Sequence, residues 1–178
     1  MKIAILSTIF SVSLIAASAQ TRQGDWMIGG NFNFSSNKQG DAKLTHINVS
    51  PDAGYFFMDN VAIGALLSIS SDKPNGGDAT TTFEFAPFAR GYFLPANNKV
   101  NVFGQGSFGV GSAKSGGSTE GFNEFSLMAG PALFLNPHTA LEFALFYKSL
   151  GGKYYKDVDG NRWNSVGLNI GFQIHLGK

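Results

Sequence analysis

Five charged side chains occur within segments that are otherwise almost free of charge, and these residues are the first candidates for chemistry. Along each segment the apolar residues concentrate in one phase of an alternating pattern, and all five charges fall in the other, mixed phase. A side-chain period of two places each phase on one face of a β-strand. If the strands enclose an interior lumen, this face would line it. We interpret the five residues as a structural network of ion pairs there, because charges away from water must be paired. A narrow path for cations through the lumen is the alternative. They are Asp52, Glu84, Arg90, Glu124 and Glu142.

The sequence contains little that could perform catalysis. The three histidines, His46, His138 and His175, lie on different segments, and none belongs to a His-x-Ser pair. The chain has no cysteine, which excludes a thiol nucleophile and a cysteine-ligated zinc site. We therefore expect no enzyme activity, and no catalytic, cofactor-binding or metal-binding residues.

Two short motifs resemble ligand-binding loops but lack the necessary context. Gly104 to Gly109 matches G-x-G-x-x-G, yet a Gly/Ser-rich stretch follows where a dinucleotide site requires a helix. Asp157 to Asn161 resembles part of a calcium loop, but Leu168 stands where the bidentate glutamate belongs. The formal net charge of +1 gives no electrostatic footprint for nucleic acid. We expect no cofactor and no nucleic-acid partner.

The segments that must position the five charges repeat the period-two pattern eight times, and no helical period is evident after Gln20. Each segment has about the length that crosses a bilayer at a tilt. The sequence therefore predicts an all-β, eight-stranded antiparallel up-and-down transmembrane β-barrel. The predicted strands are Gly24 to Phe34, Leu44 to Phe57, Val61 to Ser70, Thr81 to Phe93, Val100 to Val110, Glu124 to Leu135, Thr139 to Lys148 and Ser165 to Leu176.

The connections and the low charge indicate which face meets lipid. Short turns alternate with long loops rich in Gly, Ser, Asp, Asn and Lys, of which Ser112 to Gly121 and Ser149 to Arg162 are examples. This alternation is typical of outer-membrane barrels. Charged residues make up 14% of the chain, whereas a soluble surface usually carries about 25–35%. We expect the apolar phase to face lipid and the mixed phase to fill the lumen; a soluble lipocalin-like binder is the less favoured alternative.

Three prolines interrupt the predicted strands that run from the long-loop side to the short-turn side. They are Pro51, Pro87 and Pro131. Proline cannot donate a hydrogen bond to a β-ladder, so a central strand normally excludes it. We therefore expect β-bulges at these positions, or positions near a rim of the barrel.

The N-terminal segment differs from the rest of the chain. Met1 and Lys2 precede a mostly apolar run that ends at Ala17, and Ala17-Ser18-Ala19 offers the small residues of a signal-peptidase site. The run is shorter than the roughly 20 residues of a spanning helix. We expect residues 1–19 to be a cleaved signal peptide and residues 20–178 to form the barrel domain.

With these features the chain resembles the small eight-stranded outer-membrane barrels, the OmpX/OmpA-transmembrane-like group described as an "outer membrane protein beta-barrel domain". The resemblance rests on the leader, the eight amphipathic strands, the Gly-Tyr-Phe pieces at Gly54 and Gly91, and the closing strand. It implies an integral protein of the Gram-negative outer membrane with a structural and surface-interaction role, in which the long loops bind an extracellular ligand. A narrow, porin-like pore or carrier for small solutes is the alternative, and a lipid-modifying barrel enzyme is less favoured.

The last strand carries a further resemblance. Asn169, Gly171, Ile174 and Leu176 are similar to the signal read by the barrel-assembly machinery, although Leu176 replaces the usual aromatic residue. The implied partners are this machinery and outer-membrane lipids. Because an unpaired terminal strand offers free backbone groups, we expect it to serve in assembly and then to close the barrel against Gly24 to Phe34.

Overall fold

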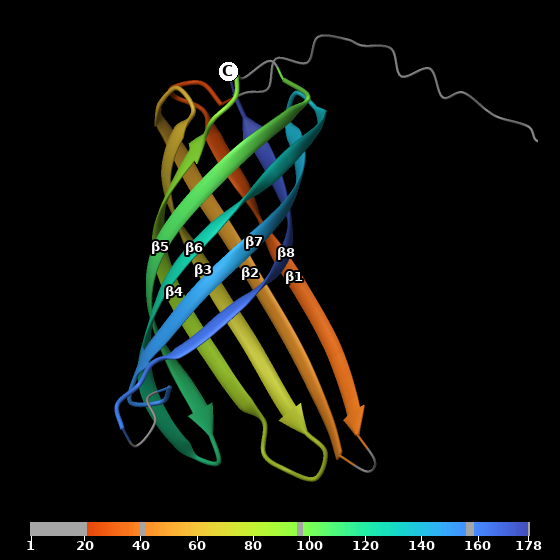
Figure 1. Cartoon of the computed structure of the whole chain (residues 1–178), viewed down its shortest axis with the longest axis vertical. Helices are drawn as coiled ribbons and strands as arrows, with labels where there is room; N and C mark the ends of the chain where they lie inside the picture. The colour runs from red at the N-terminus through yellow and green to blue at the C-terminus, as the bar shows by residue number, and fades with distance from the viewer. Residues whose placement is uncertain (1–20, 40–41, 96–97, 156–158, 178) are drawn as a thin grey trace, which may run out of the picture.

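The computed structural model of the chain describes residues 21–39, 42–95, 98–155 and 159–177, and its regular structure is a single β-barrel. The eight strands pair antiparallel in sequence order, and β1 meets β8 to close the barrel, as Figure 1 shows. The predicted fold class is therefore confirmed, whereas the predicted signal peptide lies outside the described residues. The strands are β1 (Trp26–Gln39), β2 (Ala42–Met58), β3 (Val61–Pro74), β4 (Thr80–Tyr92), β5 (Val100–Ser115), β6 (Ser118–Asn136), β7 (Thr139–Gly152) and β8 (Trp163–Leu176).

The strands extend further toward the long-loop end than their apolar pattern indicates. The predicted loop Ser112 to Gly121 is mostly a continuation of the β5–β6 ladder, which runs to the pair Ser115↔Ser118. Gly116 and Gly117 make the turn there, and both have a positive φ, which glycine adopts without a steric penalty. Backbone pairing continues beyond the apolar band because a ladder requires no apolar side chains.

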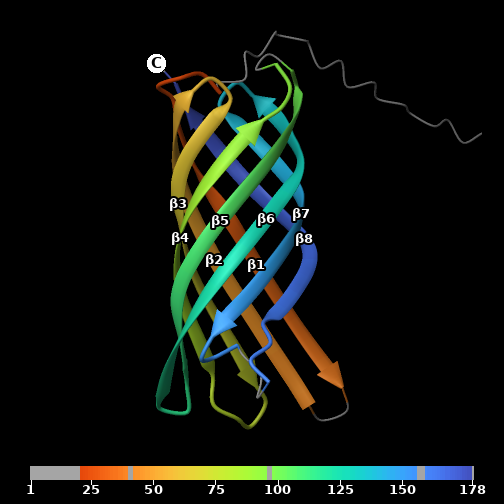
Figure 2. The same cartoon turned by 60° about the vertical axis from the view of Figure 1, so that its left-hand side comes forward.

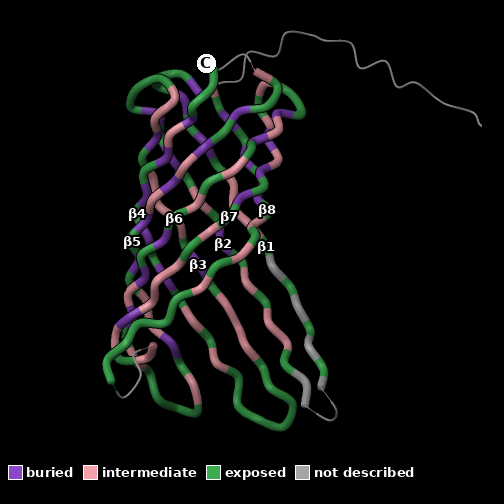
Figure 3. The backbone as a smooth tube through the Cα atoms, in the orientation of Figure 1, coloured by how far each residue is buried: buried purple, intermediate pink, exposed green. Residues whose placement is uncertain are grey.

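Exposure alternates residue by residue along the strands, as Figure 3 shows. Large apolar side chains cover the outside: Phe32 is 66% exposed, Leu145 63% and Leu168 77%. The mixed phase points inward, where Glu84, Arg90, Glu124 and Glu142 are all buried. An apolar outside with charge inside is the arrangement of a membrane barrel and the reverse of a lipocalin. Among the described residues, no helix is long and apolar enough to cross a membrane.

The prediction of bulges at the three prolines is wrong. Pro51 stays paired with Gly30 on one side, and the β2–β3 register is the same before and after it, at Val49↔Ile69 and Asp52↔Leu66. Pro87 and Pro131 repeat this arrangement, each paired on one side and skipped on the other. A proline lacks only the donor of one ladder bond, so the ladder omits that pair and needs no extra residue. The register shifts that do occur lie beside short turns, at Phe56/Met58 and Phe134/Asn136.

The seam between β1 and β8 is shorter than we expected from the sequence. Pairing runs from Trp26↔Leu176 to Asn31↔Gly171. The same register, continued, would place Gln39 opposite Trp163, but in the described part of the chain these outer segments do not pair with each other. Figures 1 and 2 show β1 departing from β8 toward the long-loop end. The prediction that the last strand closes the barrel is right, but β8 pairs only with the N-terminal part of β1, from Trp26 to Asn31.

Candidate lumen binding site

Apolar side chains fill the lumen at the short-turn end. Met27, Phe56 and Phe103 are completely buried there, and Phe134 is 2% exposed. His175 packs against the rings of Phe56 and Phe134, with centroid separations of 5.8 and 5.2 Å. We call this cluster the plug; its members are Met27, Phe56, Ala62, Phe88, Tyr92, Phe103, Ala132, Phe134, Ala140 and Ala144. An eight-stranded barrel is narrow enough for such side chains to occupy its interior.

An ion pair crosses the barrel within the plug. Arg90 Nη1 donates to Glu142 Oε1 at 2.7 Å, and both residues are 2% exposed. Arg90 Nε donates to Gln105 Oε1 at 2.7 Å, and the Tyr92 hydroxyl donates to the same Glu142 oxygen at 3.2 Å. The guanidinium carbon lies 4.6 Å from the ring centroid of Phe103. Charge pairing, extra hydrogen bonds and a ring face together offset the desolvation of these two groups.

Asp52 belongs to the same region but is held by an amide. Gln173 Nε2 donates to both carboxylate oxygens of Asp52 at 3.0 Å. The two residues lie on β2 and β8 with β1 between them, and they meet across Gly29. A Cβ on Gly29 would collide with the backbone oxygen of Phe172 as well as with Gln173 Oε1, so a larger residue there would disturb both the strand and the amide.

Glu84 and Glu124 form a separate group nearer the long-loop end. Lys148 Nζ lies 2.8 Å from Glu124 Oε1. Glu84 is 5% exposed, and its Oε1 atom has no hydrogen-bond partner among the described residues. The sequence-predicted network is thus divided: the structure brings Arg90 and Glu142 together, places Asp52 beside Gln173, and leaves Glu84 and Glu124 with one lysine.

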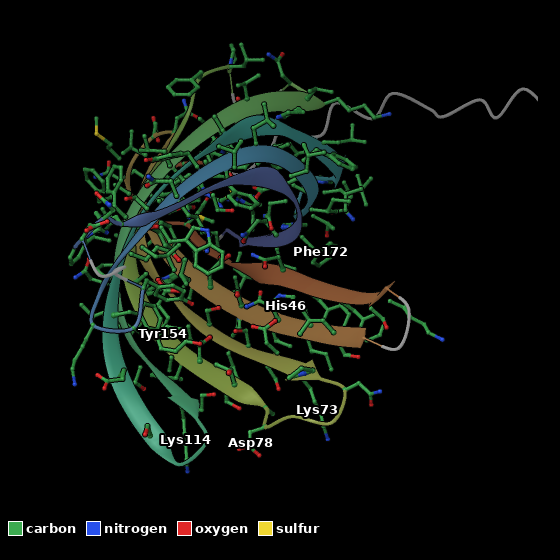
Figure 4. The ribbon with its side chains drawn as sticks, turned by 60° about the horizontal axis from the view of Figure 1, so that its bottom comes forward. His46, Lys73, Asp78, Lys114, Tyr154 and Phe172 are labelled. Atoms are coloured by element: carbon green, nitrogen blue, oxygen red, sulfur yellow. The ribbon has the colours of Figure 1, made fainter. Side chains whose placement is uncertain are left out.

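A cavity of about 670 Å³ occupies the lumen from the long-loop end, past Glu84 and Glu124, to Gln105 beside the plug. We call it the outer cavity. One wall is hydroxylic and internally bonded: Ser50 Oγ donates to Ser68 Oγ at 2.9 Å, and Ser70 bonds Thr82. Figure 4 views the barrel from its open end, where His46 on β2 and Tyr154 after β7 both lie at the opening. His46 Nδ1 is 2.7 Å from Asp72 Oδ1.

Aromatic residues form another part of the outer cavity. The Tyr155 ring makes edge contacts with Phe122, Tyr154 and Trp163 at centroid separations of 5.3, 4.8 and 5.7 Å. Sequence reasoning missed this cluster because Tyr154 and Tyr155 lie in a predicted loop, outside any alternating pattern. It also missed Gln105 and Gln173, whose only signal was a polar residue in the lumen phase of a strand.

The described histidines and carboxylates do not form a metal-binding cluster. No group of three or more His, Asp or Glu in that part of the chain could hold a metal ion. His138 lies on the short-turn side, where its Nδ1 is 3.1 Å from the carbonyl oxygen of His175. On β8, Asn169 Nδ2 contacts Met128 Sδ in the lumen at 3.6 Å, Gly171 is buried, and Ile174 and Leu176 face outward.

Comparison with known proteins gives the same architecture. The family model for the outer membrane protein beta-barrel domain matches residues 3–177. The outer membrane protein OprG from Pseudomonas aeruginosa is 15% identical, with a TM-score of 0.50 over 88% of this chain and 98% of that chain. Neisserial surface protein A (NspA) is also 15% identical, with a TM-score of 0.51 over 84% of this chain and 94% of that one. No curated protein matches the sequence. At these identities the two structures show a shared fold.

Proposed function

The chain belongs to the outer membrane protein beta-barrel domain family, and from this membership we propose that it is a non-enzymatic surface-interaction protein. In this proposal the barrel displays its long loops and the outer cavity to the cell exterior, where they bind an extracellular ligand. The rigid scaffold positions the loops, and the loops and cavity supply the specificity.

The plug is the observation that carries this proposal. The outer cavity opens toward the long loops, whereas the other end of the lumen contains completely buried rings and the Arg90–Glu142 pair. A site that is open on one side and filled on the other is suited to binding rather than to passage. Concave sites with a few convergent polar groups are where small ligands usually bind.

Planar-bilayer conductance tests the proposal against its alternative, a narrow pore. We expect no defined single-channel steps from the reconstituted parent protein. The variant Phe103→Ala combined with Phe134→Ala removes two rings of the plug and provides a reference with a wider lumen. Stable conductance steps from the parent protein would favour the pore and contradict the binding proposal.

We also propose that the chain is exported with a cleaved signal peptide and that β8 acts as its assembly address. Ala17-Ser18-Ala19 after an apolar run supports the first statement. Intact-mass analysis of the membrane-extracted protein tests it, with a mature chain beginning at Gln20 expected. Retention of residues 1–19 would contradict it.

A further inference from the structure

We propose that the outer cavity binds a small organic cation, a protonated primary amine on an apolar or aromatic body, and that Glu84 is its counter-ion. This inference rests on the proposed surface-binding function, because it names the ligand class for the same cavity. Three observations carry it: a carboxylate oxygen without a partner among the described residues, a pair of glycines over which this carboxylate and a phenylalanine ring lie, and a cluster of rings beside it.

The charges in the wall of the outer cavity are unbalanced. Glu84 and Glu124 both face the lumen, and the one cation bonded to either of them in the described structure is Lys148, on Glu124. Glu84 is only 5% exposed, and its Oε1 has no hydrogen-bond partner within the part of the chain that the structure describes. A buried carboxylate without a donor is costly, so a ligand ammonium, which carries three donors, would satisfy it.

Two glycines on β5 make room for Glu84 and for the ring of Phe122. Gly111 pairs with Glu84 on β4 and Gly109 pairs with Glu124 on β6, so both carboxylates border the same stretch of bare backbone. A Cβ on Gly109 would lie only 2.0 Å from Glu84 Oε1, which shows that this oxygen rests directly over the glycine. Glu84 occupies the space over Gly109 and Phe122 the space over Gly111, so a larger residue at either position would displace a side chain that lines the outer cavity.

The rings beside Glu84 indicate the chemical nature of the rest of the ligand. Phe122 lies over Gly111, in the same cross-strand row as Glu84. Its ring contacts that of Tyr155, which in turn contacts Trp163. The hydroxyls on the β2–β4 wall bond one another. An ammonium on Glu84 would thus carry an apolar or aromatic body against ring faces, where cations are also attracted.

The electrostatics of Tyr155, in the segment after β7, agree with a negative cavity. Burial raises the pKa of the Tyr155 phenol to about 12, with further contributions from Tyr154 and from the negative charges of Glu124, Asp72 and Glu84. The phenol is therefore neutral at physiological pH and adds no competing charge. An inorganic cation is a poorer occupant, because the described carboxylates and histidines form no group of three metal ligands.

Isothermal titration calorimetry on the refolded full barrel in detergent micelles tests the inference. The probe is 2-phenylethylammonium, compared with neutral 2-phenylethanol and anionic 3-phenylpropionate on the parent protein. We expect the amine to bind at least about tenfold more tightly than the alcohol, with no binding of the anion. No amine binding at millimolar concentration, or equal binding of the alcohol, would overturn the inference without any variant.

Glu84→Gln then assigns the site. It keeps the size of the side chain and removes the charge, and we expect amine affinity to fall at least about tenfold. The matched control is Asp59→Asn, which removes the same charge at the opposite end of the barrel and should leave affinity unchanged. Unchanged binding to Glu84→Gln would also overturn the inference. A barrel that forms no channel yet binds no amine would refute the ligand class while leaving the proposed surface-binding function intact.

Discussion

Among single residues, Arg90 makes three side-chain hydrogen bonds in the lumen. It bonds Glu142 and Gln105 and lies against the ring of Phe103. Removing one partner of a buried ion pair typically costs about 3–5 kcal/mol, because the remaining charge is uncompensated. We expect Arg90→Met to lower the urea midpoint of unfolding in micelles far more than Lys114→Met, which changes an exposed residue.

A double variant separates the value of the pair from the penalty of an orphaned charge. Arg90→Met combined with Glu142→Leu should recover most of the stability lost in Arg90→Met, because the buried carboxylate is then gone. Equal midpoints for Arg90→Met and Lys114→Met would show that Arg90 is exposed to solvent, contrary to the structure.

The residue scale also shows what sequence patterns can and cannot reveal. Lumen facing was predictable for Glu84, Arg90 and Glu142 because a strand has only two faces. The partners were not predictable, since Arg90 and Glu142 lie on β4 and β7, and their contact depends on the curvature of the closed barrel. The roles of Gly29 and Gly109 depend on a neighbour's side-chain conformation, which no period encodes.

At the level of elements, all eight strands were predictable, but their ends and irregularities were not. Apolar alternation reports the lipid-facing band, so the polar extension of β5 and β6 to Ser115 and Ser118 was interpreted as a loop. The prolines were assigned to bulges or to positions near a rim because a central ladder normally excludes them, whereas here each omits one pair. Both errors arise because backbone pairing tolerates what side-chain patterns do not record.

The short seam leads to a cross-linking prediction. Ile28 and Ile174 are paired across β1 and β8. Phe34 and Leu168 would be opposite in the same register, but the seam does not extend to them. Since the chain has no cysteine, introduced pairs report cleanly. We expect mild oxidation to cross-link Ile28→Cys with Ile174→Cys much faster than Phe34→Cys with Leu168→Cys. Comparable rates would mean that the strands pair along their full length.

The outward side chains of β8 give a prediction about assembly. Ile174→Asp with Leu176→Asp should block membrane insertion, because both side chains face outward on the strand proposed as the assembly address. Val100→Asp with Val102→Asp, at outward positions near the start of β5, controls for charge on the lipid face, which is tolerated better near an interface. Deleting Gly177 and Lys178 should have no effect. Equal insertion of both double variants, measured by gel-mobility shift of membrane fractions, would contradict a special role for β8.

The whole molecule has two chemically different ends, and this asymmetry fixes its expected orientation. The short turns, the plug and the C-terminus lie at one end, and Lys73, Asp78 and Lys114 project from the long hairpins at the other, as Figures 1 and 4 show. An even number of strands returns both termini to the same side, which in outer-membrane barrels is the periplasm. The outer cavity should therefore open to the exterior.

An epitope tag between Gly116 and Gly117 should be labelled on intact cells, whereas a tag at Pro137 should be labelled only after permeabilisation. If only the tag at Pro137 were labelled on intact cells, the orientation would be the opposite one, and a ligand of the cavity would have to come from the periplasm.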